Sequence, residues 1–163
     1  MMKKVLMSAI AVLLLAGIST AMDLTGKNGI GIRANNLSFR HFVNNSFGFD
    51  IGANYYRSTQ DGLTDSNNYN YAIGGFWVKE VFKDVLLEAG ATLQGWNGYN
   101  AITDLNYNGI GINPFIGAEC FINEHFSVDG KVFIAAYASQ MEGADRTTNT
   151  DFLGGNLGAH IYF

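Results

Sequence analysis

Charged side chains recur at matching positions around three short polar turns, and they are the residues whose types and spacing could do chemistry. A carboxylate follows each turn, at Asp50, Glu88 and Asp129. Ionic groups that converge in a protein interior can form a salt-bridge network, conduct protons or ions, or serve an active site as acid and base. The candidate set is Arg33, Arg40, Asp50, Glu80, Glu88, Glu119, Asp129, Lys131 and His160.

The elements that must position these residues are β-strands, because apolar and polar residues alternate along the chain. The ending DFLGGNLGAHIYF places Leu157, Ala159 and Ile161 on one parity, and His160 and Tyr162 on the other. Such alternation is typical of a strand with one apolar and one polar face. The charged candidates fall on the polar parity.

Short turns alternate with longer polar stretches, which predicts strands running up and down. The expected strands are Gly29–Asn35, Leu37–Val43, Phe47–Ser58, Tyr69–Phe82, Leu86–Trp96, Tyr107–Ile122, Phe126–Ser139 and Phe152–Phe163. The turns after Phe42, Phe82 and Phe121 repeat at intervals of 40 and 39 residues, which indicates a repeated hairpin unit. If 35–36 is not a turn, the first two strands merge and the count falls to seven; an even count favours eight.

The first residues predict export. Lys3 and Lys4 precede an apolar run and a Ser-Thr-Ala ending at Ala21, the pattern of a cleaved secretory signal over residues 1–21. Residues 22–163 form one domain. Without the two lysines, eight basic residues face fourteen acidic ones, a formal charge of −6 that argues against nucleic acid. The single Cys120 makes no internal disulfide.

The composition of the two faces separates a membrane barrel from a soluble β-protein, which would also alternate. Charged residues are only 15% of the chain, and the polar face carries many Gly, Phe and Tyr with few Lys. Aromatic residues collect near both strand ends, as at two membrane–water interfaces. The expected girdle is Tyr55, Tyr69, Tyr71, Trp96 and Tyr107 at one end, and Phe47, Phe82, Phe126 and Phe163 at the other. We therefore expect an all-β, eight-stranded antiparallel up-and-down transmembrane β-barrel.

The signal, the GIGIRA opening at 29–34, the repeated turns and the GAHIYF ending at 158–163 resemble the small outer-membrane barrels of the OmpA/OmpX type. The resemblance covers the whole mature chain and implies the bacterial outer membrane as location. It also implies recognition of the last strand, ending at Phe163, by the barrel-assembly machinery, and outer-membrane lipid and lipopolysaccharide as surroundings.

The interior of an eight-stranded barrel is just wide enough for side chains to fill it. Ions confined there must be paired, so the charged set is interpreted as a structural plug in which Arg40 and Lys131 bridge carboxylates and Arg33 caps them. A proton or ion path is disfavoured by bulky residues of the same face, such as Phe115, Phe133 and Tyr137.

Catalysis and metal binding find little support in the residue pattern. No His lies in a long polar stretch beside a nucleophile, as a lipid A-modifying enzyme would need. Cys120 and the separated His residues match no zinc spacing. We expect no cofactor, no metal and no enzymatic activity, and a structural or surface-interaction role, such as adhesion or host contact, through the long loops. A minor porin for small solutes is the alternative.

Overall fold

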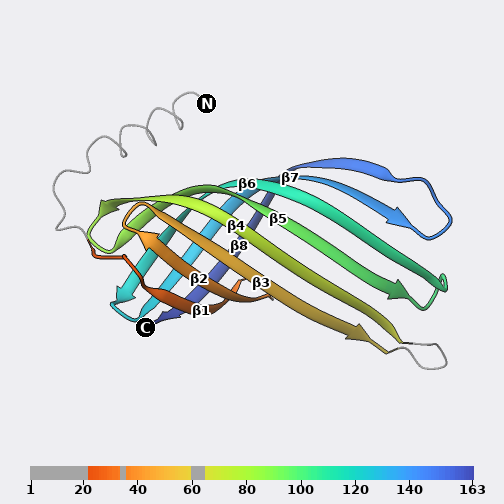
Figure 1. Ribbon diagram of the computed structural model, residues 1–163, viewed down its shortest axis with the longest axis horizontal. Helices are drawn as coiled ribbons and strands as arrows, with labels where there is room; N and C mark the ends of the chain where they lie inside the picture. Colours follow the sequence, from red (N-terminus) through yellow and green to blue (C-terminus); the bar gives the residue numbers. More distant parts are fainter. Residues whose placement is uncertain (1–21, 34–35, 60–64) are drawn as a thin grey trace.

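Eight antiparallel strands close into one barrel in the computed structural model, which describes residues 22–33, 36–59 and 65–163 (Figure 1). The strands are β1 (Asn28–Arg33), β2 (Asn36–Asn44), β3 (Phe47–Ser58), β4 (Ser66–Phe82), β5 (Val85–Asn100), β6 (Leu105–Asn123), β7 (Phe126–Met141) and β8 (Thr147–Tyr162). Each pairs with its neighbour in sequence, and β8 pairs with β1. The predicted eight-stranded up-and-down barrel is confirmed, with the first two strands separate. The expected signal over residues 1–21 lies outside the described residues.

Alternation along the strands gives the barrel an outside and an inside of opposite character. On β6, Ile112 and Ile116 point outward and are 45% and 64% exposed, whereas Glu119, on the other parity, is fully buried. Arg40 on β2 is buried as completely. Within the described part of the chain, no helix is long and apolar enough to cross a membrane.

The repeated hairpin seen in the sequence is a repeated structure. Two-residue turns at 45–46, 83–84 and 124–125 join β2 to β3, β4 to β5 and β6 to β7. Each turn is preceded by a β-bulge, between Phe42 and Asn44, Glu80 and Phe82, and Phe121 and Asn123. A bulge adds one residue to one strand and strengthens the local twist. The three short turns gather near the C-terminus, at the left of Figure 1.

At the opposite end the strands are longer than expected from the sequence. β4 begins at Ser66, β5 continues to Asn100 and β8 begins at Thr147, so the connections shrink to residues 101–104 between β5 and β6 and 142–146 between β7 and β8. The stretches 97–106 and 140–151, which lie between expected strands, are therefore largely paired hairpins. The predicted strand ends were wrong here because Asn, Gly and Thr, which are common in turns, also occur in the exposed ends of these paired strands.

The wall of the barrel is uneven in height. β1 and β2 are short, and we call them the low wall (Figure 1). β1 pairs with β8 only between Gly29 and Arg33, and β2 pairs with β3 only up to Ala53. Among the described residues, 54–58 of β3 and 147–157 of β8 consequently pair on one side only. The other strands rise past the low wall toward the loop end.

Candidate functional site

An apolar layer fills the barrel interior next to the short turns. It consists of Leu24, Phe42, Phe76, Val78, Leu86, Phe121 and Tyr162, all buried. Leu24 precedes β1 and reaches into this layer: its backbone N–H donates to Asn45 Oδ1 at 2.7 Å, and the N–H of Gly26 donates to the Phe42 carbonyl at 2.9 Å. The short-turn end is therefore closed by the chain's own residues.

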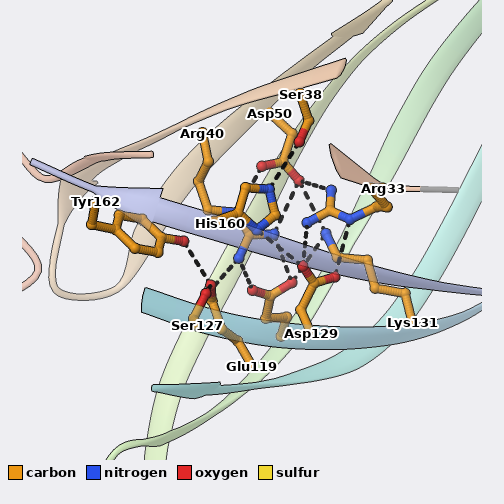
Figure 2. A network of polar contacts seen from close by, with 11 residues as sticks. Arg33, Ser38, Arg40, Asp50, Glu119, Ser127, Asp129, Lys131, His160 and Tyr162 are labelled. Carbon is orange, nitrogen blue, oxygen red and sulfur yellow. Dashed lines mark hydrogen bonds and ion pairs between the residues drawn. The ribbon is translucent and has the colours of Figure 1, made fainter. Parts of the chain in front are cut away.

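Above this layer, Arg40 is the centre of an ion network (Figure 2). Its Nε donates to Asp50 Oδ1 at 2.8 Å, and its Nη1 lies 2.5 Å from both Glu88 Oε1 and Glu119 Oε2. The guanidinium therefore joins β2 to β3, β5 and β6. A buried ion requires this pairing, because leaving one unpaired in a low-dielectric interior costs several kcal/mol.

Two further cations complete the network on the side facing the loop end. Arg33 donates from Nη1 to Asp50 Oδ2 at 2.6 Å, and from Nε and Nη2 to the two oxygens of Asp129 at 3.0 and 3.1 Å. Lys131 Nζ lies 3.0 Å from both Asp50 Oδ2 and Glu88 Oε2. Each of the three cations therefore contacts at least two carboxylates, which come from different strands.

Three hydroxyl groups outside the predicted set of charged residues add hydrogen bonds to the network. Ser127 Oγ and Tyr162 Oη donate to Glu119 Oε1 at 2.5 and 2.6 Å, and Ser38 Oγ lies 2.9 Å from His160 Nε2. All three lie on the polar parity of their strands, beside the charged candidates in sequence. That shared parity is the signal by which they could have been found.

The structure brings eight of the nine sequence candidates together. Arg33, Arg40, Asp50, Glu88, Glu119, Asp129, Lys131 and His160 form the network, with His160 Nδ1 lying 3.1 Å from Asp129 Oδ2. The expectation for Glu80 was wrong. Glu80 sits beside the bulge near the short-turn end, where its Oε2 accepts a hydrogen bond from the Met22 backbone N–H at 3.0 Å. It is too close to the turn to reach the ion layer.

The aromatic residues divide between two faces. Those that are exposed on the outside are Tyr55, Tyr69, Tyr71, Phe47, Phe82, Phe126 and Phe163. Tyr55 and Tyr69 pair across β3 and β4, with ring centroids 4.8 Å apart.

Two residues assigned to the girdle face the interior instead. The Trp96 ring lies 5.8 Å from that of Tyr137, and Tyr107 shares the inward parity of Gly109 and Gly111 on β6. The interpretation of Trp96 and Tyr107 as girdle residues was wrong, because residue type indicates depth in a membrane whereas strand parity decides the face.

Ser38, His160 and Asp129 follow one another in the order of a nucleophile, a base and the acid that orients the base. The arrangement belongs to the ion network for three reasons. Both oxygens of Asp129 already bind Arg33, and His160 Nδ1 is buried without a properly directed hydrogen bond. An imidazolium formed during nucleophilic attack would also stand close to the Arg33 guanidinium, which would destabilise it.

Glu119, Asp129 and His160 place three ligand-type atoms within 4.8 Å of one another. Arg40 and Arg33 already supply positive charge to the two carboxylates. A metal ion at this position would have to displace them. The geometry therefore fits a salt-bridge layer better than a metal centre.

Comparisons with known proteins give structural neighbours alone. No protein-family model matches the chain, and no curated protein matches it. Among solved structures, the crystal structure of CarO from Acinetobacter baumannii aligns with 13% identity and a TM-score of 0.42, over 90% of this chain and 99% of that chain. The crystal structure of Acinetobacter baumannii CarO2 aligns with 11% identity and a TM-score of 0.36, over 87% and 100% of the respective chains.

Proposed function

We propose that this chain is an integral bacterial outer-membrane β-barrel, of the small OmpA/OmpX type, with a closed interior and a structural or surface-interaction role at its loop end. The observation that carries the proposal is the inverted polarity of the barrel. Aliphatic side chains cover the outside, while its ions are buried within. In water this arrangement would expose a large apolar surface, whereas in a bilayer it places that surface against acyl chains.

The closed wall supports the same proposal. A sheet in lipid must satisfy every backbone hydrogen bond, so strands cross a bilayer as closed barrels. The seam between β1 and β8 is fully paired over Gly29–Arg33. The free edges of β3 and β8 begin above the low wall, toward the loop end, where we place the surface of the membrane. Phe163 directly follows β8, the strand at this seam, and the barrel-assembly machinery is the partner we propose for this strand end.

The filled interior favours a structural role over the alternative of a minor porin. Between the short turns and the loop end, an apolar layer and the ion network follow one another across the lumen. A solute crossing the barrel would have to break buried ion pairs of Arg40, which is 0% exposed. We therefore propose that the folded barrel conducts no ions.

The loop end is the surface we propose for contact with lipopolysaccharide or with an extracellular partner. Its hairpins are stiffened by their own polar contacts: Arg57 pairs with Asp65, Tyr99 Oη donates to Asp104 at 2.6 Å, and Asn106 Nδ2 donates to Glu142 at 2.8 Å. Preorganised hairpins lose less conformational entropy on binding than free loops do.

Three measurements test this proposal. Fractionation of cells should recover the protein with outer membranes, and the protein folded in detergent should migrate differently in gels before and after boiling. In planar bilayers it should give no discrete single-channel steps. A folded monomer that stays in solution without detergent would contradict the location, and regular conductance steps would contradict the closed interior.

A further inference from the structure

A cavity of about 220 Å³, lined by both polar and apolar residues, lies inside the barrel, directly above the ion network. Asp50, Lys131 and Arg33 line it and also belong to the network, so the network is its floor. Arg33 is the last residue of β1, and Asn36, which also lines the cavity, is the first of β2. The cavity therefore lies at the height where the low wall ends. A smaller cavity of about 110 Å³ continues upward and shares Asn36 and Gln94 with it.

The walls of the cavity carry neutral hydrogen-bonding groups. Asn113 on β6 and Asn156 on β8 both line it, and the Oδ1 atoms of both are buried without a hydrogen-bond partner. Thr92 and Gln94 add a hydroxyl and a further amide from β5. A buried polar group without a partner has lost its hydrogen bonds to water and gained none in return, which destabilises it. The two amide oxygens therefore favour an occupant that donates hydrogen bonds to them.

Aromatic rings give the cavity an apolar side as well. Phe115 and Phe133 are directly opposite each other on β6 and β7, and both line the cavity. The Phe133 ring packs against Gly154, where a Cβ would approach the ring to 2.4 Å, and this fixes the ring's position. Lys131 Nζ lies 4.0 Å from the Phe115 centroid. An occupant thus meets amides on some sides and ring carbon on others.

The charges of the floor favour a neutral occupant over an ionic one. Arg33 and Lys131 each contact two carboxylates, and Asp50 Oδ2 lies within 3.2 Å of donors from Arg33, Arg40 and Lys131. Every charged group that lines the cavity is therefore already paired with a group of opposite charge. An anion would compete with buried carboxylates for the cations, and a cation would compete with the arginines and lysine for Asp50.

We propose that this cavity binds a small, neutral, polyhydroxylated solute of about monosaccharide size, which reaches it from the loop end. Hydroxyl groups both donate and accept, which suits amides and a threonine, and the C–H faces of a sugar ring suit phenylalanine. The volume is several times the roughly 30 Å³ that one water occupies in the liquid, and below the roughly 300 Å³ of sites for drug-sized ligands. The ion network closes the path below, so the solute is bound and does not pass.

The two tryptophans of the chain make the proposal measurable. Trp77 is on the outside and is 42% exposed, whereas Trp96 lines the upper cavity. In the variant Trp77→Phe, folded in detergent, Trp96 is the only tryptophan. The probes are D-glucose, D-galactose and myo-inositol, with sodium acetate and ammonium chloride as ionic controls. We expect a saturable change in Trp96 emission with at least one polyol and with neither salt.

Asn113→Leu, made in the same background, replaces an amide by an apolar side chain of similar size. It should raise the polyol concentration needed for half-maximal response at least tenfold. The matched control is Asn108→Leu, which removes an exposed amide of outward parity on the same strand and should leave the response unchanged. If Asn113→Leu does not fold, Asn156→Leu tests the part of the wall formed by β8. The proposal is overturned by a folded protein that responds to no polyol, by a response to the salts alone, or by equal responses in the Asn113 or Asn156 variant and in the control.

Discussion

Glu119 and Asp129 stand directly opposite each other on β6 and β7, with both side chains buried inside the barrel. Two carboxylates in this position repel each other. Each carboxylate is compensated by a different guanidinium: Arg40 binds Glu119, and Arg33 binds Asp129. Both arginines also bind Asp50, which makes one network of the two pairs.

Replacing Arg40 should strongly destabilise the barrel. Arg40→Met keeps most of the side-chain volume but leaves Asp50, Glu88 and Glu119 without their shared cation. Removing one partner of a buried ion pair typically costs about 3–5 kcal/mol. We expect the free energy of unfolding to fall by this amount. The measurement is urea-induced unfolding in lipid vesicles.

The control for that change is Arg57→Met. Arg57 also pairs with an aspartate, Asp65, but its side chain is 59% exposed at the loop end. Exposed pairs contribute little. Equal losses for the two variants would show that the buried network does not stabilise the barrel.

Asp50→Asn and Glu119→Gln each remove one negative charge without changing the shape of the side chain. They should lower the free energy of unfolding by different amounts, because different hydrogen-bond donors surround the two carboxylates. Around Asp50 the donors are Arg33, Arg40 and Lys131, which cannot accept a hydrogen bond from the amide of Asp50→Asn. Around Glu119 Oε1 they are the hydroxyls of Ser127 and Tyr162, which can rotate to accept one from Glu119→Gln.

We expect a loss of about 3–5 kcal/mol for Asp50→Asn and about 1–3 kcal/mol for Glu119→Gln, from the same unfolding titrations. The reverse order would contradict the assignment of donors and acceptors in the network.

Closure of the barrel depends on the lack of a side chain at Gly31. A Cβ there would lie 2.0 Å from the Ala159 carbonyl oxygen and 2.5 Å from the His160 ring, on the seam between β1 and β8. Gly31→Ala should therefore lower stability by about 1–3 kcal/mol. Gly75→Ala is the matched control, since nothing lies within 4 Å of its Cβ position. The fraction of protein that keeps its folded gel mobility across a temperature series measures both, and similar curves would count against a tight seam.

Much of the ion network could be predicted from the sequence. The parity of a residue along its strand determines which face its side chain lies on, and its distance from a short turn determines its depth in the barrel. Asp50 and Glu88 each follow a short turn, which predicts a similar depth in the barrel, and in the structure they share Arg40 and Lys131. The individual contacts could not be predicted. Arg33 and Asp129 are 96 residues apart, and their contact depends on the stagger of all the strands around the barrel.

The failures have equally specific causes. Trp96 was assigned by residue type against its own parity, and Glu80 was assigned without allowance for the bulge beside it. The length of the hairpins was underestimated because the residues of an exposed ladder resemble those of a loop. The cavity walls could be recognised only in three dimensions, since Asn113 and Asn156 come from strands separated by β7.

A charged substitution on the outer surface of the barrel should show whether that surface faces lipid or water. Ile116 is 64% exposed in the middle of β6, and Ile102 is 74% exposed in the turn between β5 and β6. In vesicles, Ile116→Arg should cost about 2–4 kcal/mol of unfolding free energy, because the charge enters the hydrocarbon layer. Ile102→Arg should be neutral. In an aqueous environment both changes would be tolerated, so equal stabilities would contradict the membrane location.

The most direct test of the central claim, that the apolar outside faces lipid and the polar inside does not, compares the two tryptophans. Trp96→Phe leaves only Trp77, on the outside, and Trp77→Phe leaves only Trp96, on the inside. Each variant is folded into vesicles whose phosphatidylcholine carries bromine on its acyl chains, and its emission is compared with that in unbrominated vesicles. We predict strong quenching of Trp77 and little quenching of Trp96. Equal quenching of both, or stronger quenching of Trp96, would contradict the account.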